Sequence, residues 1–413
     1  MVRKILLLLV IFIALLPFWM WVGWLLTPAT PSSFIILDKT VPVESRQEHQ
    51  SFNFILTSNK YTTPEQKLYD SRKDYYGYFP LDEGRYTIKD FSHITHSELS
   101  QLAENSTGAY YTDTYGIFHN DWYFIRNLIY PPESVYGGLQ HNDIRLLKEF
   151  KKKHKLILTE FNLLASPTSR KYRHQVETLF DMQWTGWTGR YFESLDSLKN
   201  PEIPDWLIRN YRQQNKGNWP FTSSGIVLVH TSGKLVILES EEHLKSAAPV
   251  IETSSDRYLN EFNIPRSVPY PFWFDIMNSG PANSVVSVYR LDINKQGEKK
   301  LRANNLPSVF PAVIEHDRMP YHREYYPQYF GWLPSPAIDY TDRDYTFYYF
   351  AGDFADNPVE PYLARLKGIR IFRRFLYRPN DIGDRRRFFW DYYYPLIDNI
   401  LEEYISETEM LNK

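Results

Sequence analysis

The chain has 413 residues, with 47 basic and 49 acidic side chains and a formal net charge of −2. This near balance excludes proteins that bind nucleic acid through bulk positive charge, because neutralising phosphates requires a basic surface. Cysteine is absent, which excludes disulfides, cysteine-ligated metals and thiol nucleophiles. Aromatic residues make up 17% of the chain, a high share whose location has to be explained.

The first predicted element is an uncharged, apolar run from Ile5 to Leu26. As a helix it would be about 33 Å long, which matches a bilayer core of about 30 Å. Arg3 and Lys4 precede the run and three tryptophans lie at its far end, so the N-terminus is expected in the cytoplasm. We therefore predict a transmembrane signal-anchor over residues 1–26 of a single-pass membrane protein, with the main domain extracytoplasmic. A cleaved signal peptide is the competing interpretation.

Residues 27–33 form a predicted linker, after which short apolar runs alternate with amphipathic stretches. This alternation, with short connections, predicts an α/β fold with a mostly parallel, flavodoxin-like, doubly wound sheet over residues 34–200. The expected strands are Phe34–Leu37, Ala109–Thr112 and Leu156–Thr159, and the expected helices are Gln47–Ser58, one opening at the Thr95-x-x-Glu98 capping box, Asp143–Phe150, and one carrying Tyr172, Val176 and Phe180.

The second half is predicted to be rich in strands. Residues 201–360 are expected to continue the first part and return to the same sheet, and residues 361–413 to form a helical segment interrupted at Pro395. Turn signals predict hairpins around Thr231-Ser232-Gly233 and around Lys295-Gln296-Gly297. If Val309–Ile314 and Tyr345–Phe350 pair as antiparallel strands, Glu315 and His316 lie at the opposite end from Asp353.

Searches for phosphate-binding loops, a dinucleotide fingerprint, a zinc-protease motif and a nucleophile elbow find none in the sequence. No cofactor is therefore predicted. Two groups of possible ligands, His93-x-x-His96 and Glu315-His316-Asp317, are interpreted as surface or helix-capping residues, so no metal site is predicted.

One pattern does point to a site, because four apolar runs each end in an acid: Asp38, Asp113, Glu160 and Asp353. Ligands of open α/β sheets bind outside the carboxyl ends of the strands. If the four strands are parallel neighbours, these carboxylates would project into one crevice, where paired acids can serve as acid and base or as acid and nucleophile in glycosyl chemistry. The alternative is that they cap the following helices. We take the four as candidate catalytic residues.

Polar and aromatic residues in the neighbouring loops are candidates for ligand binding. Aromatic faces beside amide and charged groups suit sugar rings, whose C–H faces stack while their hydroxyls form hydrogen bonds. Trp184 and Trp187, three residues apart, are equally compatible with the core. The candidate ligand-binding residues are Lys39, Tyr115, Asn120, Asn162, Trp184, Trp187 and Arg190.

The stretch from Val135 to Thr168 resembles the class I glutamine-amidotransferase-like fold, including its ThuA-like relatives. Gly137-Gly138, a helix and a strand follow the order of that family, and Tyr349–Asp353 is similar to its late strand and turn. Where the family's cysteine would stand, this chain has Glu160–Ser166, and it has no cysteine elsewhere. The resemblance thus implies the fold without the catalytic cysteine, and it transfers no activity.

Three functions are compatible with these features. The first is a membrane-anchored domain that binds a cell-envelope glycan without chemistry. The second is an enzyme that acts on such a glycan through its carboxylates. The third is a structural subunit of an envelope complex. The expected partners are the membrane, through residues 5–26, and a glycan or envelope polymer, with no nucleic acid.

Overall fold

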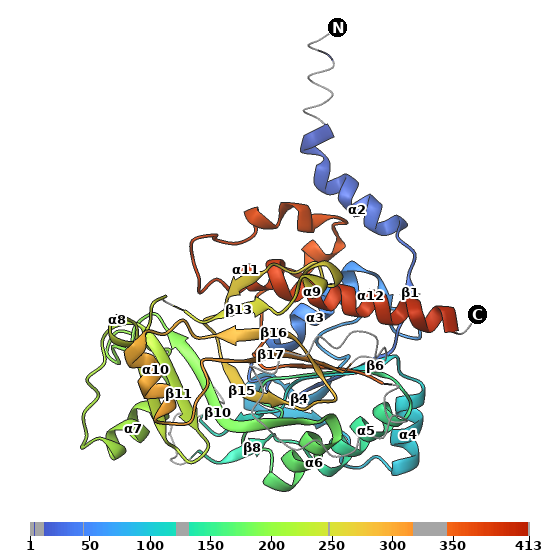
Figure 1. Ribbon diagram of the computed structural model, residues 1–413. Coiled ribbons are helices and arrows are strands. Elements are labelled where there is room, and N and C mark those ends of the chain that lie inside the picture. The colour runs from blue at the N-terminus through green and yellow to red at the C-terminus, as the bar shows by residue number, and fades with distance from the viewer. Residues whose placement is uncertain are drawn as a thin grey trace.

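A ten-stranded sheet runs through the centre of the computed structural model, which describes residues 4, 12–43, 45–120, 132–246, 248–316 and 345–411. Helices cover both faces of this sheet, with α3 and α12 on one side and α4, α5 and α6 on the other (Figure 1). A second, four-stranded sheet lies at one end of the molecule. These helices are α3 Gln47–Ser58, α4 His96–Glu104, α5 His141–Lys152, α6 Arg170–Phe180 and α12 Tyr394–Leu411.

Five neighbouring strands of the large sheet are parallel, in the order β4-β2-β6-β9-β18. Most of their residues are buried on both faces, which explains why the sequence shows continuous apolar runs instead of alternation. They are β2 Phe34–Asp38, β4 Tyr76–Pro80, β6 Gly108–Asp113, β9 Leu156–Glu160 and β18 Thr346–Phe350.

The remaining strands of this sheet are antiparallel to their neighbours, so the prediction of a mostly parallel, flavodoxin-like sheet is wrong. Among the described residues the sheet has four parallel and five antiparallel strand pairs. An apolar run that is buried on both faces looks the same in either direction, so the sequence did not reveal the strand direction. These strands are β5 Tyr86–Lys89, β13 Val250–Thr253, β14 Ser267–Pro269, β16 Ser284–Arg290 and β17 Val309–His316.

The smaller sheet is antiparallel, in the order β12-β11-β10-β15. Its β11–β12 hairpin confirms the turn predicted at Thr231–Gly233, where Gly233 has a φ of 88°. The second predicted turn is wrong, because Lys295–Arg302 form the helix α10. The strands are β10 Met182–Phe192, β11 Gly225–His230, β12 Leu235–Glu239 and β15 Phe274–Ser279.

The N-terminal helix α2, Leu16–Leu26, has 11 residues. In the described part of the chain, no helix is both long and apolar enough to cross a membrane. This finding contradicts the predicted transmembrane signal-anchor over residues 1–26, and with it the single-pass topology and the extracytoplasmic location derived from it. Residues 5–11 of the predicted segment lie outside the described residues.

The C-terminal helix is interrupted just before Pro395, as predicted, by one π-helical turn. Proline has no N–H to donate within a helix, which is consistent with this break. The C-terminal elements are η4 Pro361–Arg365, η5 Ile369–Phe375, α11 Arg385–Phe388 and η6 Phe389–Tyr393. The other short elements are β1 Thr30–Pro31, β3 Tyr61–Thr62, η1 Asp82–Gly84, β7 Ile117–Phe118, β8 Ser134–Tyr136, α7 Asp205–Gln214, α8 Ser240–His243 and α9 Asp256–Glu261.

Much of the high aromatic content lies in the core. Nine of the twelve largest fully buried side chains are tyrosines, and several of them place the hydroxyl on an internal partner. Tyr111, for example, donates to the backbone oxygen of Asp143, and Tyr392 shares a hydrogen bond with Ser287. A buried tyrosine contributes a large apolar surface while its hydroxyl remains satisfied. The composition therefore reflects packing in large part, and is not by itself evidence for sugar binding.

Candidate functional site

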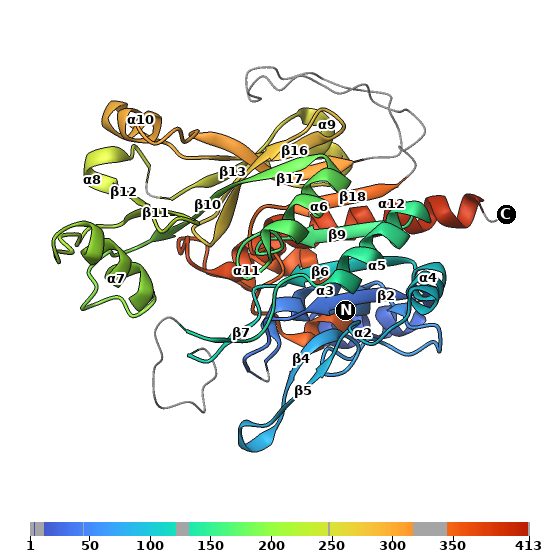
Figure 2. The same ribbon diagram turned by 90° about the horizontal axis from the view of Figure 1, so that it is seen from below.

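The four acids identified in the sequence lie at one edge of the parallel strands. Asp38, Asp113 and Glu160 are the last residues of β2, β6 and β9, and Asp353 follows the end of β18. In register, Asp38 is opposite Asp113 and Glu160 is opposite Phe350. Figure 2 shows these four strands side by side. Because they are parallel neighbours, their carboxyl ends bring the acids to the same edge of the sheet.

Asp38 is fully buried and paired with a histidine from α3. Its Oδ2 lies 2.6 Å from His49 Nδ1, and its Oδ1 accepts a hydrogen bond from Thr40 N at 3.0 Å. Burial raises the pKa of Asp38, and the contact with His49 opposes this effect. Since both of its carboxylate oxygens have partners inside the protein, Asp38 stabilises the local structure of this edge.

Asp113 occupies the neighbouring position on β6 and remains slightly exposed, at 8%. Tyr115 N donates to its Oδ1 at 2.6 Å, and Asn162 Nδ2 donates to its Oδ2 at 3.2 Å. Burial raises the pKa of Asp113 well above the usual range, and the charges of Asp353 and Asp38 add to this effect. The environment of Asp113 therefore favours the protonated form more than water does.

Glu160 lies deeper, next to β6. Tyr110 Oη donates to its Oε2 at 2.6 Å, and Ala355 N donates to the same oxygen at 3.2 Å. Burial raises the pKa of Glu160 well above its usual range, with Asp353 as the next largest cause. Like Asp38, this acid is enclosed by protein groups.

Asp353 and Asp356 share one arginine, Arg385 from the start of α11. Arg385 Nη2 lies 2.8 Å from Asp353 Oδ2, and its Nη1 lies 3.2 Å from Asp356 Oδ2. The guanidinium stacks over Phe272, with its carbon 4.3 Å from the ring centroid. Burial raises the pKa of Asp353 to about 7, even though Arg385 acts in the opposite direction. Its side chain is 15% exposed, so Asp353 is more accessible than Asp38 or Glu160.

A further acid of this edge, Glu48, was not identified from the sequence. Its Oε2 is buried and has no hydrogen-bond partner among the described residues. Burial raises the pKa of Glu48 well above its usual range, and the charges of Asp38 and Asp356 contribute. In the sequence Glu48 looks like an ordinary acid in the first turn of a helix, so no signal distinguished it. Asp356 and Arg385 were not identified either, because neither ends an apolar run in the sequence.

The predicted ligand-binding residues divide into two groups. Lys39 is fully buried, and its Nζ contacts Asp143 Oδ2 at 2.6 Å and donates to Gly138 O at 2.9 Å. Trp184 and Trp187 are 7% and 8% exposed, and Trp184 Nε1 donates to the backbone oxygen of Trp187. All three side chains lie in the protein interior. Trp184 and Trp187 pack as core residues, as in the alternative interpretation of these tryptophans.

The second group is partly exposed, and two of its members, Asn162 and Tyr115, contact Asp113 at the edge. Asn162 binds Asp113, as described above, and Tyr115 is partly exposed and contacts Phe118 with the ring centroids 4.8 Å apart. The charge of Arg190 interacts with those of Asp353 and Arg385. Asn120 is partly exposed and lies two residues after β7.

Among the described residues, no group of three or more His, Asp or Glu side chains is arranged to hold a metal ion. Two of the acids at the sheet edge are paired with a basic side chain, Asp38 with His49 and Asp353 with Arg385. What the acids offer chemically is proton transfer and hydrogen bonding, and of the four predicted acids Asp113 and Asp353 are the more exposed.

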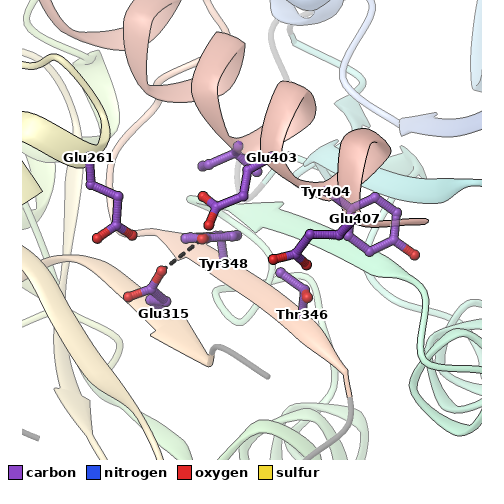
Figure 3. Close-up of a pocket in the computed structure, with 8 residues that line it drawn as sticks. Glu261, Glu315, Thr346, Tyr348, Glu403, Tyr404 and Glu407 are labelled. Carbon is purple, nitrogen blue, oxygen red and sulfur yellow. Dashed lines mark hydrogen bonds between the residues drawn. The ribbon is translucent and has the colours of Figure 1, made fainter. Parts of the chain in front are cut away.

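A pocket lies at the other end of the sheet (Figure 3). Because β17 is antiparallel to β18, Glu315 is opposite Tyr348, which confirms the prediction that it lies away from Asp353. Tyr348 Oη donates to Glu315 Oε1 at 2.7 Å. No predicted site residue lines this pocket. Its lining residues are Glu261, Glu315, Thr346, Tyr348, Ile400, Glu403, Tyr404 and Glu407.

Comparisons with known proteins were made at three levels. No protein-family model matches the chain, and no curated protein matches it either. Among solved structures, the chain is similar to one described as a ThuA-like protein from Bacteroides uniformis, with 9% sequence identity and a TM-score of 0.36. The match covers 87% of this chain and 97% of that protein. A similarity of this size gives only weak support to a ThuA-like fold and carries no argument about function.

Proposed function

We propose that the protein binds a glycan at the carboxyl edge of β2, β6, β9 and β18 and acts on it with Asp113 and Asp353. The observation that supports this proposal most directly is the difference between these two acids. Both lie at one sheet edge, Asp113 at the end of β6 and Asp353 after β18 with β9 between these strands, and both retain some exposure. Burial raises the pKa of each, but only Asp353 is paired with a cation, Arg385. Two carboxyl groups in different electrostatic environments can divide the roles of acid and base.

In this proposal Asp113 is the general acid. It would donate its proton to the glycosidic oxygen of the leaving group while Asp353, ionised beside Arg385, takes a proton from the attacking water. Asn162 would orient Asp113, because its amide already donates to Oδ2. Asp38 and Glu160 would maintain the surrounding polar structure without touching the substrate, since their oxygens are held by protein groups.

The choice of a glycan rests on the groups beside the acids. Trp273, which is partly exposed, offers an aromatic face, and its backbone oxygen accepts from Asp353 N at 3.2 Å. Carboxylates, amides and an arginine around an aromatic ring suit a polyhydroxylated ligand, whose hydroxyls need hydrogen-bond partners. The tryptophans predicted for this role, Trp184 and Trp187, do not support it, since they are buried.

The test is a screen of the purified full chain for binding and hydrolysis of a panel of polysaccharides, followed by Asp113→Asn and Asp353→Asn. We expect each variant to lose hydrolysis by about 100-fold or more, as is typical for removal of an acid or base. Asp256→Asn serves as the matched control, because this aspartate is 77% exposed and belongs to another part of the chain. Full activity in both variants, with unchanged melting temperatures, would contradict the assignment.

A second function, glycan binding without chemistry, is favoured by one observation. Two of the four acids, Asp38 and Glu160, are 0% and 1% exposed and bonded to internal groups. If these acids only support the edge, two carboxyl groups are left, and Asp113 and Asp353 can serve as acceptors for sugar hydroxyls without any chemistry. Measurable binding of a glycan that the wild-type chain never hydrolyses would support this second function over the first.

A further inference from the structure

Arg190 lies on β10 of the smaller sheet, close to the edge that carries the acids. Its guanidinium carbon is 4.8 Å from the ring centroid of Phe192 and 5.8 Å from that of Trp273. Trp273 is in turn bonded through its backbone to Asp353. These contacts connect Arg190 to the proposed site, and its charge interacts with those of Arg385 and Asp353.

The hydrogen bonds of Arg190 are incomplete. Its Nη2 donates to Glu202, a residue whose side chain is 64% exposed, whereas the Arg190 side chain itself is only 22% exposed. Nε is buried and has no hydrogen-bond partner among the described residues. Burial is the main cause that lowers the pKa of Arg190, as expected for a cation that has lost part of its hydration. An ion pair with an exposed carboxylate is a weak replacement for that hydration.

The other arginine of the edge, Arg385, already binds the carboxylates of both Asp353 and Asp356. A ligand carboxylate that replaced Glu202 would leave the net charge around Arg190 unchanged. It could also accept from Nε and Nη2 together, a bidentate geometry that is stronger than a single contact. On this basis, and resting on the proposed glycan-binding function, we infer that the glycan is acidic and that Arg190 binds its uronate carboxylate in place of Glu202.

The experiment uses the full chain and oligosaccharides of galacturonate, alginate and hyaluronan, each beside its carboxyl-reduced, neutral form. Dissociation constants are measured by calorimetry for the wild type, Arg190→Gln and Glu202→Gln. Arg266→Gln is the matched control, because Arg266 belongs to an exposed ion pair with Asp256 elsewhere on the chain. Glu202 is on the surface, so Glu202→Gln remains informative even if Arg190→Gln is poorly folded.

We expect at least one acidic oligosaccharide to bind at least about tenfold more tightly than its reduced form, and Arg190→Gln to abolish that difference. Glu202→Gln removes the competing carboxylate and should strengthen binding of the acidic form about twofold to fivefold, while leaving the neutral form unchanged. Equal binding of acidic and reduced forms would overturn the inference and leave the glycan-binding proposal intact. If no oligosaccharide of either kind binds, both are overturned.

Discussion

At the scale of single residues, the hydrogen bonds of His49 explain how the carboxyl group of Asp38 can be fully buried. His49 Nε2 lies 2.8 Å from the backbone oxygen of Ser71, which can only accept, so Nε2 carries a proton. A second proton must then lie between Nδ1 and Asp38 Oδ2, which are 2.6 Å apart. Whether this proton resides on the histidine or on the acid, the pair is neutral as a whole. The Asp38–His49 pair as a whole thus adds no net charge to the edge.

Asp275 provides a test of how burial affects stability. It lies on β15 with no exposure, where Thr188 Oγ1 and Tyr349 Oη donate to its two oxygens at 2.8 and 3.1 Å. Burial raises the pKa of Asp275 to about 7, above the unfolded value of 3.8. Between these two values the folded state holds a proton that the unfolded state has released. The stability contributed by this group is therefore complete below about pH 4 and is lost as the pH rises through 7.

We expect the free energy of unfolding, measured with urea, to be lower at pH 8 than at pH 5. Between pH 5 and the folded pKa of about 7, this one group accounts for at most about 3 kcal/mol. Asp353, whose pKa burial also raises to about 7, contributes in the same direction. Asp275→Asn cannot titrate and should reduce the difference between the two pH values. An identical pH dependence in Asp275→Asn and the wild type would show that Asp275 does not titrate in this range.

At the scale of elements, α10 shows how a local signal was misinterpreted. The glycine in Lys295-Gln296-Gly297 indicates a turn, but the preceding Asn294 starts a helix instead. Its Oδ1 accepts from Gln296 N at 2.9 Å and Gly297 N at 3.1 Å, as an N-cap does. Lys299, Lys300 and Arg302 follow in the last turn, where the helix dipole favours cations.

The corresponding prediction concerns this cap. Asn294→Ala leaves two backbone N–H groups without their side-chain acceptor and should lower the free energy of unfolding by about 1 kcal/mol. Asn294→Asp keeps an acceptor at the same position and should retain most of the stability. Chemical denaturation of the three proteins compares these effects. If alanine and aspartate are equally tolerated, the side chain does not stabilise α10.

Features that depend on neighbouring residues could be predicted from the sequence. The capping box at Thr95 and Glu98 is present, with Glu98 N 3.3 Å from Thr95 Oγ1 and Thr95 N 2.8 Å from the Glu98 carboxylate. The position of three acids at strand ends followed from the same kind of pattern. Arg385 lies 32 residues from Asp353, its partner, and only the folded chain brings them together. Strand direction and the burial of Trp184 likewise depend on distant segments.

At the scale of the whole molecule, the two halves of the sequence share one sheet. β18, from the second half, lies between β17 and β9 and pairs with β9 over its whole length, from Thr346 opposite Leu156 to Phe350 opposite Glu160. The main hydrophobic core likewise extends from Phe34 to Ile405. The acids of the candidate site also come from both halves, since Asp353 follows β18. The site therefore depends on the complete fold.

This arrangement predicts that residues 34–200 do not fold alone, although the sequence suggested a domain with these boundaries. Such a fragment would lack β18 and leave the buried strand β9 with an open edge, and β10 would lose both of its neighbours, β11 and β15. Exposed edges and apolar surface favour aggregation over a folded state. We expect the full chain to unfold in one cooperative transition, followed by near-UV circular dichroism, and the fragment to show neither a near-UV signal nor a transition. A cooperative transition in the fragment would demonstrate that the first half is an independent domain and that the second half only docks against it.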